Sequence, residues 1–231
     1  MRKGRGWVLA YTLTIFCALA IVHWGSRAVT AISEHTPLPR SQCIIIDAGH
    51  GGIDGGAISC SGKPESQYNL DISLKLRDLL HLLGYQTKMI RTLDESIYTE
   101  GKTVAAKKAS DLKQRVKIVN ETPESLLISI HQNTYPDQRY WGAQVFYSGT
   151  AGSRELAVSL QNALANGLSP HTARKCKKAS GVYLMDHIKS PGILIECGFI
   201  SNPKEEKRLA DPDYQRRLCT VIAGSLAQFL G

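Results

Sequence analysis

The sequence lacks any closely spaced pair of cysteines, although it contains six cysteines in 231 residues. Cys17 lies in an apolar segment near the start of the chain, which leaves an odd number of cysteines and no C-x-x-C spacing. This pattern indicates neither a zinc knuckle nor a disulfide framework. We therefore expect most of the cysteines to act as small buried hydrophobic residues.

Also missing is a dense stripe of basic residues interleaved with aromatic residues, which is typical of nucleic-acid-binding proteins. Half of the formal net charge of +8 lies in residues 1–40, which carry five basic residues and one acidic residue. Elsewhere the basic residues are scattered, apart from Lys107–Lys108 and Arg174–Lys178. We expect no nucleic-acid partner. The basic side chains either form an ordinary solvated surface or attract an anionic wall polymer weakly.

The glycine-rich run GHGGIDGG at 49–56 is not followed by the Lys-Ser or Lys-Thr pair of a phosphate-binding loop, which excludes that class of site. The chain also contains no internal repeat, and therefore no wall-binding repeats. Any attachment to a cell wall must come from an N-terminal anchor, the surface of the domain or a partner protein.

The N-terminal segment has the pattern of an export signal. Residues 1–6 are basic, and residues 7–24 contain no Lys, Arg, Asp or Glu. This is typical of a signal peptide or of a signal anchor with its basic end inside the cell. The apolar run is long and no clean A-x-A cleavage site follows, which favours a retained transmembrane anchor; a cleaved signal stays open. Residues 25–41 are interpreted as a linker, and residues 42–231 as an exported domain.

Short apolar runs alternate with segments of helical periodicity in the rest of the chain, and 43% of all residues are hydrophobic, which is enough to build a core. This alternation predicts a single three-layer α/β domain with a mixed, mostly parallel central sheet flanked by helices. Strands are predicted at 43–47, 85–90, 126–130, 142–147 and 192–196. Helices are predicted at 69–83, after caps at Ser110 and Ser153, from Asn202-Pro203, and at 214–229. Loops are predicted at 94–109 and 170–180.

Three polar residues stand at the ends of predicted strands. His50 follows the first strand, His131 ends the third, and Glu196 ends the last. Ligands of open α/β sheets bind beyond the carboxyl ends of the strands, so these side chains should converge. Two histidines with nearby carboxylates are typical of a catalytic zinc site, which uses three protein ligands and leaves one position for water.

A third zinc ligand and a general base must then come from carboxylates. Glu65 and Glu196 are the first candidates, and Asp47 and Asp54 are the alternatives. The residues alone do not divide the two roles between them.

The chain resembles the zinc-dependent N-acetylmuramoyl-L-alanine amidases of the Amidase_3 type over nearly all of residues 43–230. The ordered set of matching runs, which is much more specific than any single motif, is IIIDAGHGGIDGGA (44–57), KPE (63–65), NLDISLKL (69–76), RTLD (91–94), LKQRVKIVN (112–120), SIHQN (129–133), GAQVFY (142–147), GVYL (181–184) and PGILIECGFISNP (191–203).

This resemblance implies an enzyme that hydrolyses the amide bond between muramic acid and L-alanine in peptidoglycan. It places His50, Glu65 and His131 at the three zinc ligands and Glu196 at the catalytic glutamate. As a further hypothesis, Asp47 or a backbone carbonyl accepts the second ring N–H of a ligating histidine.

The chain departs from the wider family in two places. The sequence Asp54-Gly55-Gly56 stands where many members have a proline after the aspartate, which should loosen the loop without removing a ligand. Only ten residues, 132–141, separate His131 from Gly142. This is too short for the helix-bearing insertion that plugs the site of the cell-division amidases, so we predict a metal site that no helix covers.

The short chain, the apolar N-terminal segment and the run KKASDLKQRVKIVN (107–120) are most similar to the germination-specific amidases of spore-forming bacteria. This similarity implies action on spore-cortex peptidoglycan before muramic-δ-lactam formation, with a muramic acid deacetylase acting next. It also implies a location outside the cytoplasm, in the envelope space of the forespore, either membrane-anchored or exported. An activating envelope protein is the other partner to consider.

Two other functions stay open. A zinc peptidase that cuts within the stem peptide would share the metal and the base and differ only in its product. A non-catalytic wall-binding module would keep the fold but lack a ligand or the base, whereas all four positions are filled here.

Among the remaining polar and aromatic residues, Arg91 and Arg115 are interpreted as members of structural ion pairs. Cys197 should point away from Glu196, because successive residues of a strand face opposite ways, and is therefore not expected to be a nucleophile. Trp141 and Tyr135 flank the presumed cleft, where they contact substrate or simply pack on the surface.

Overall fold

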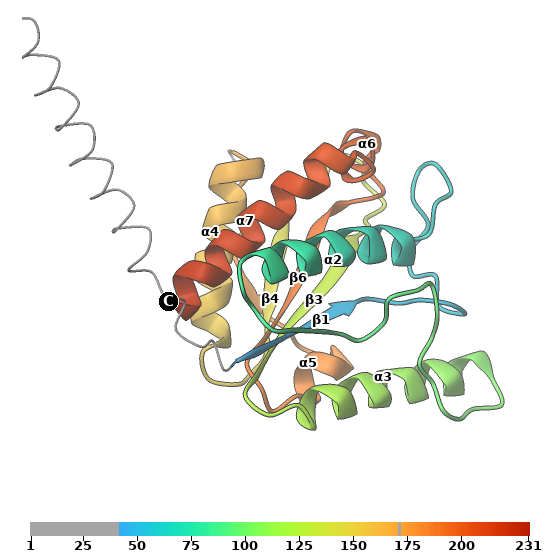
Figure 1. The fold of residues 1–231 in the computed structure, drawn as a ribbon. Helices are drawn as coiled ribbons and strands as arrows, with labels where there is room; N and C mark the ends of the chain where they lie inside the picture. Colours follow the sequence, from blue (N-terminus) through green and yellow to red (C-terminus); the bar gives the residue numbers. More distant parts are fainter. Residues whose placement is uncertain (1–41, 171) are drawn as a thin grey trace, which may run out of the picture. The chain divides into compact units, whose positions relative to one another are not determined.

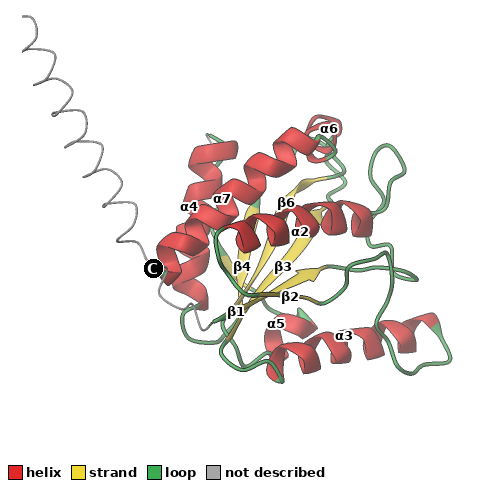
Figure 2. Ribbon diagram, viewed as in Figure 1, coloured by secondary structure: helices red, strands yellow, loops and turns green. Residues whose placement is uncertain are grey.

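The computed structural model describes residues 42–231 except His171. The predicted signal segment (1–24) and linker (25–41) lie outside the described residues. The described part of the chain forms one α/β domain, in which a six-stranded sheet lies between two layers of helices (Figure 1, Figure 2). The predicted three-layer architecture is confirmed. None of the helices in this part of the chain is long and apolar enough to cross a membrane.

The strands follow the order β2-β1-β3-β6-β4-β5 across the sheet. The first four of these run parallel, β4 lies antiparallel beside β6, and β5 runs parallel to β4. The sheet is therefore mixed and mostly parallel, as predicted. The strands are β1 (Cys43–Ala48), β2 (Thr87–Met89), β3 (Ser125–Asn133), β4 (Gln144–Tyr147), β5 (Lys177–Lys178) and β6 (Gly192–Phe199).

Helices cover both faces of this sheet (Figure 1). One face is covered by α2 (Glu65–Leu82), α4 (Ser153–Leu168) and α7 (Pro212–Leu230), and the other by α3 (Val104–Asn120) and α5 (Tyr183–His187). The short helix α6 (Pro203–Leu209) connects β6 to α7. As predicted, the Asn202 side chain caps α6 by accepting hydrogen bonds from two backbone N–H groups, with proline at the first helical position.

The apolar runs of the central strands serve two separate cores. Ile44 and Ile46 pack with the α2, α4 and α7 side, whereas Ile45 packs with the α3 and α5 side, and all three are fully buried. A strand buried on both faces is apolar at most positions, which is why these parallel strands show no regular polar alternation.

Several predicted boundaries were wrong. The helix α3 begins at Val104 rather than after Ser110, because Thr103 supplies the cap by accepting from the Ala106 N–H (3.2 Å). The Ser110 hydroxyl, inside the helix, instead accepts from the backbone N–H groups of the preceding loop at 99–100. The α4 cap is Gly152, one residue before the predicted Ser153. The strand β5 and the helix α5, with two and five residues, are too short to produce a periodic pattern.

All five cysteines in the described residues are free. Cys197 and Cys219 are buried as expected, but Cys43 and Cys176 are only partly buried and Cys60 is exposed, so the expectation that most cysteines are buried was wrong for the described residues. Cys197 packs in the α2 and α7 core, on the face of β6 opposite to Glu196, and burial raises the pKa of its thiol well above the usual value. The prediction that Cys197 is no nucleophile agrees with this position.

Candidate functional site

Three side chains from different elements meet at the carboxyl edge of the sheet. His50 follows β1, Glu65 is the first residue of α2, and His131 lies in β3. Their candidate ligand atoms all lie within 4.8 Å of one another. The Glu65 carboxylate lies between the two rings, 3.3 Å from His50 Nε2 and 3.0 Å from His131 Nδ1. The structure therefore brings together the three residues that the sequence singled out as metal ligands.

The glycine-rich run provides the room for this convergence. A Cβ atom on Gly49 would overlap the His131 ring, and one on Gly56 would lie 2.6 Å from a Glu65 carboxylate oxygen. His50 itself has a φ of +60°, which is uncommon for non-glycine residues. The glycines at 49–56 thus allow side chains to approach the backbone closely.

A second carboxylate orients His50. The His50 Nδ1 atom lies 2.8 Å from Asp54 Oδ2, which leaves Nε2 directed toward Glu65. Asp54 is held in turn by Lys108, whose Nζ lies 2.7 Å from Oδ1. A carboxylate that accepts the second ring N–H of a ligating histidine is a common feature of metal sites.

The hypothesis named Asp47 or a backbone carbonyl for this orienting role, but at His50 the structure places Asp54 there instead. The Asp47 carboxylate is fully buried and accepts hydrogen bonds from Arg115 (2.5 Å) and from the Ser129 hydroxyl (2.6 Å). Because its position at the end of β1 places it against the middle of α3, it meets Arg115 before it can reach a histidine. Nothing in the sequence pattern distinguished Asp54, four residues after His50 in an irregular turn.

The two buried arginines shape the turn that carries His50. Arg115 forms the predicted ion pairs, with Asp47 and Asp111, and also donates to the His50 carbonyl oxygen (2.8 Å). Arg91, which was also predicted to form an ion pair, instead donates hydrogen bonds to backbone carbonyl oxygens. Its four acceptors are the carbonyls of Ala48, Gly49, Ser66 and Leu93.

The electrostatics of the cluster suit a cation. Burial opposes a charge on His50, but hydrogen bonds and the negative charges of Glu65 and Asp54 outweigh it and raise the His50 pKa to about 9. Burial likewise opposes ionisation of Glu65, yet hydrogen bonds from His131 and His50 hold its pKa well below the usual range. Two imidazoles and one carboxylate are a donor set of catalytic zinc sites, so these residues fit a zinc ion.

Glu196 lies beside this cluster on the neighbouring strand. Its Cα atom pairs with that of His131 in the β3–β6 register. The carboxylate is half-buried, and its Oε2 atom is shielded from solvent with no hydrogen-bond partner among the described residues. Burial raises the pKa of Glu196 to about 7; the charge of His131 opposes this rise and that of Glu65 adds to it. An unpartnered carboxylate with a pKa near neutrality can both accept and return a proton.

The site is open to solvent. The described segment 134–143 forms a loop without a helix, in agreement with the predicted absence of a plug. The side chains of His50 and His131 keep 26% and 19% of their surface exposed. A cavity of about 190 Å³ continues from both histidines toward Leu112 of α3 and Leu184 of α5.

Comparisons with known proteins agree with this geometry. The family Amidase_3, described as N-acetylmuramoyl-L-alanine amidase, matches residues 44–228. A germination-specific N-acetylmuramoyl-L-alanine amidase of Bacillus subtilis is 41% identical over 196 residues, which cover 83% of this chain and 81% of that protein. The solved structure of the CwlD amidase from Clostridioides difficile, in complex with the GerS lipoprotein, matches with a TM-score of 0.78 and 37% identity, over 81% of this chain and 98% of that one. An N-acetylmuramoyl-L-alanine amidase from Clostridium difficile 630 matches with a TM-score of 0.71 and 28% identity, over 82% of this chain and 96% of that one. The chain therefore belongs to the Amidase_3 family of N-acetylmuramoyl-L-alanine amidases, enzymes that act on peptidoglycan.

Proposed function

We propose that the chain is a zinc-dependent hydrolase of the amide bond that joins the lactyl group of muramic acid to L-alanine. In this proposal His50, Glu65 and His131 hold the zinc ion and Glu196 transfers the proton. The observation that carries it is the approach of the three ligand atoms to within 4.8 Å, beside a shielded Glu196 oxygen that has no hydrogen-bond partner in the described part of the chain.

When bound, zinc would lower the pKa of a water ligand and polarise the scissile carbonyl group. Glu196 takes the proton from the attacking water and returns it to the departing alanine nitrogen. Burial raises the pKa of Glu196 in the chain without metal, which favours a carboxyl group that can return a proton as well as take one. The Asp54 carboxylate fixes the His50 ring so that Nε2 faces the site.

The biological setting that we propose is the maturation of spore cortex for germination. The support is the 41% identity to a germination-specific amidase over most of both chains. In this role the enzyme acts outside the cytoplasm, in the envelope space of the forespore, before a muramic acid deacetylase completes the δ-lactam. The N-terminal segment would export the domain or hold it at the membrane.

An activating partner is part of this proposal. The CwlD structure that this chain resembles was solved in complex with the GerS lipoprotein. We propose that an envelope protein of comparable role binds this chain, and that zinc loading or activity depends on it.

The test is a digestion of purified peptidoglycan with the zinc-loaded full-length chain and with its Glu196→Gln variant. Released fragments are identified by mass spectrometry. Intact stem peptides that begin with L-alanine, released by the wild type and not by the variant, are the expected result. Fragments cut within the stem peptide would establish a peptidase instead.

Bound zinc without any release would leave the chain dependent on a partner, which is then tested by adding candidate envelope proteins. Absence of both zinc binding and release, with or without those proteins, would contradict the proposal and favour a wall-binding module.

A further inference from the structure

Next to the site, the carboxyl edge of the sheet continues from β6 to β4 and β5. β1, β3 and β6 end at this edge, and the antiparallel β4 begins there. Gln144, the first residue of β4, pairs directly with Glu196, so the two side chains lie on the same face. The Gln144 side chain also reaches toward β5: its Nε2 donates to the carbonyl oxygen of Lys175 (2.9 Å), in the segment that leads into that strand.

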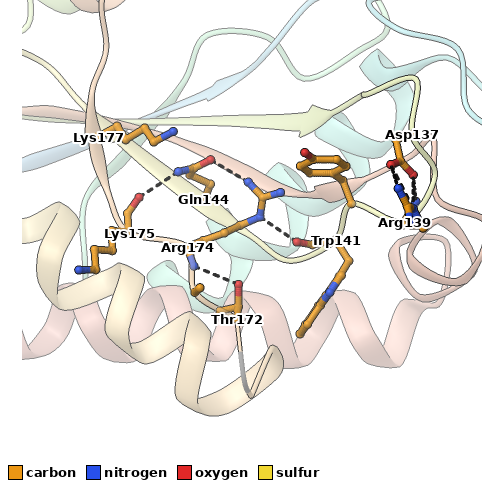
Figure 3. Close-up of a pocket in the computed structure, with 10 residues that line it drawn as sticks. Asp137, Arg139, Trp141, Gln144, Thr172, Arg174, Lys175 and Lys177 are labelled. Carbon is orange, nitrogen blue, oxygen red and sulfur yellow. Dashed lines mark hydrogen bonds and ion pairs between the residues drawn. The ribbon is translucent and has the colours of Figure 1, made fainter.

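A large groove opens beside β4 and β5. It has a volume of about 830 Å³ and lies between the loop 137–141 and the segment 172–177 (Figure 3). Arg174 lies across its floor, where Nη1 donates to Gln144 Oε1 (2.9 Å) and Nε donates to the Trp141 carbonyl oxygen (2.8 Å). The guanidinium therefore contacts Gln144, the residue that pairs with Glu196.

Among the described residues, the unpaired positive charges of the groove form no ion pair, although the negative charge of Glu205 acts on Arg174. Both acceptors of Arg174 are neutral oxygens, and no carboxylate of the described residues lies within salt-bridge distance of Arg174, Lys175 or Lys177. The one carboxylate in the groove wall, Asp137, is paired with Arg139 (2.7 Å). A half-buried arginine whose hydrogen bonds go only to neutral oxygens keeps its preference for a planar anion such as a carboxylate.

Contacts within the chain hold the walls of the groove in place. The buried Glu205 carboxylate accepts hydrogen bonds from the N–H groups of Gly142 and Phe199, both at 2.9 Å. The Asn202 side chain donates to the Tyr140 carbonyl oxygen (3.2 Å). The Arg174 guanidinium also stacks 4.5 Å from the centre of the Phe199 ring. A binding surface that is ordered in advance loses less conformational entropy when its ligand arrives.

We propose that this groove binds a carboxylate of the peptide portion of the substrate, with Arg174 as the main docking group and Lys175 and Lys177 beside it. The proposal rests on the amidase function proposed above. The charges of the substrate indicate which side of the scissile bond, sugar or peptide, lies in the groove. On the sugar side of the scissile bond the lactyl carboxyl is consumed in the amide and the N-acetylated sugars are neutral. The stem peptide, in contrast, carries free carboxylates on its glutamate and diamino-acid residues, which match the positive charges of Arg174, Lys175 and Lys177.

The test compares two soluble substrates, a disaccharide muramyl tripeptide with free side carboxylates and the same compound with those groups as carboxamides. For the zinc-loaded full-length chain, Arg174→Gln should raise KM for the carboxylate substrate about tenfold, the value of a charge-assisted hydrogen bond, with kcat unchanged. On the carboxamide substrate the same variant should match the wild type. Arg174→Lys should restore part of the lost affinity.

A second variant covers the chance that the loss of Arg174 disturbs the groove. The double substitution Lys175→Gln/Lys177→Gln leaves the floor intact and should raise KM in the same substrate-dependent way, by a smaller factor because both lysines are exposed. The control is Lys178→Gln, which removes an equal charge from the adjacent position of β5, outside the groove lining.

Equal KM changes on both substrates, or no change for either groove variant, would overturn the proposal while leaving the amidase function in place. If the wild type cleaves neither substrate, with or without the candidate envelope proteins, the amidase function fails instead. In that case, the proposal that the groove binds a stem-peptide carboxylate is tested by titrating the free stem tripeptide into the wild type and into Arg174→Gln. Weaker binding to the variant supports the groove, and equal or absent binding to both overturns it.

Discussion

His50 Nδ1 lies 2.8 Å from Asp54 Oδ2, and this contact sets which nitrogen of the ring faces the metal cluster. Because Asp54 accepts at Nδ1, the opposite nitrogen, Nε2, is the one that lies 3.3 Å from Glu65. The orientation of a candidate zinc ligand thus depends on a carboxylate four residues away, which is itself anchored by Lys108 on α3.

We predict that Asp54→Asn weakens zinc binding by about 10- to 100-fold, because the amide no longer supports the ligating form and orientation of His50. Zinc affinity is measured by competition with a chelator of known affinity. The control is Asp71→Asn, which removes a surface carboxylate of α2 that pairs with Lys63. If the zinc affinity of Asp54→Asn is within twofold of that of the control, the contact between Asp54 and His50 has no part in metal binding.

Zinc uptake at neutral pH should release about one proton from His50. With its pKa raised to about 9, His50 is protonated at pH 7 in the metal-free protein, whereas a zinc ligand must be neutral. The release should therefore be largest below pH 9 and vanish above it. Calorimetric titration at pH 7 in buffers of different ionisation enthalpy measures the number of protons. A heat of binding that does not depend on the buffer would contradict the raised pKa.

The core and the three-layer architecture could be predicted from sequence because β1, β3 and β6 are mostly apolar runs that end near polar residues. Convergence of His50, His131 and Glu196 followed from the same strand ends. The supporting residues could not be predicted. Whether Asp47 or Asp54 meets a histidine depends on how α3 packs against the sheet, which no local pattern encodes. The same packing decides that Arg91 contacts carbonyl groups and not a carboxylate.

The buried ion pair of Asp47 with Arg115 predicts a specific dependence of stability on pH. Burial alone would raise the pKa of Asp47, but the Arg115 charge and hydrogen bonds lower it below its unfolded value of about 3.9. Its contribution to the free energy of unfolding is therefore complete above pH 5 and is lost only as the pH falls below about 4.

Asp47→Asn should accordingly lower the free energy of unfolding by about 3 kcal/mol at pH 7, since it removes one partner of a buried pair. Urea denaturation at several pH values measures this difference. It should stay constant from pH 5 to 8 and shrink below about pH 4. A difference that already declines between pH 7 and 5 would assign the effect to another titrating group.

The close approach of Gly49 to His131 provides a steric test of the site. A Cβ atom at Gly49 would overlap the imidazole, and the backbone around it is fixed by Arg91 and by the Gly49 N–H bond to Ile130 (3.0 Å). Because the backbone cannot retreat, Gly49→Ala must displace His131 from Glu65, and we expect zinc binding and hydrolysis to be lost together. Gly224→Ala is the matched control: nothing lies within 4 Å of its added methyl group, and alanine favours the helix by about 1 kcal/mol. The measurements are zinc content, peptide release and the thermal unfolding midpoint. If Gly49→Ala folds, binds one zinc and cleaves like the control, His131 does not need the position seen here and cannot be an essential ligand.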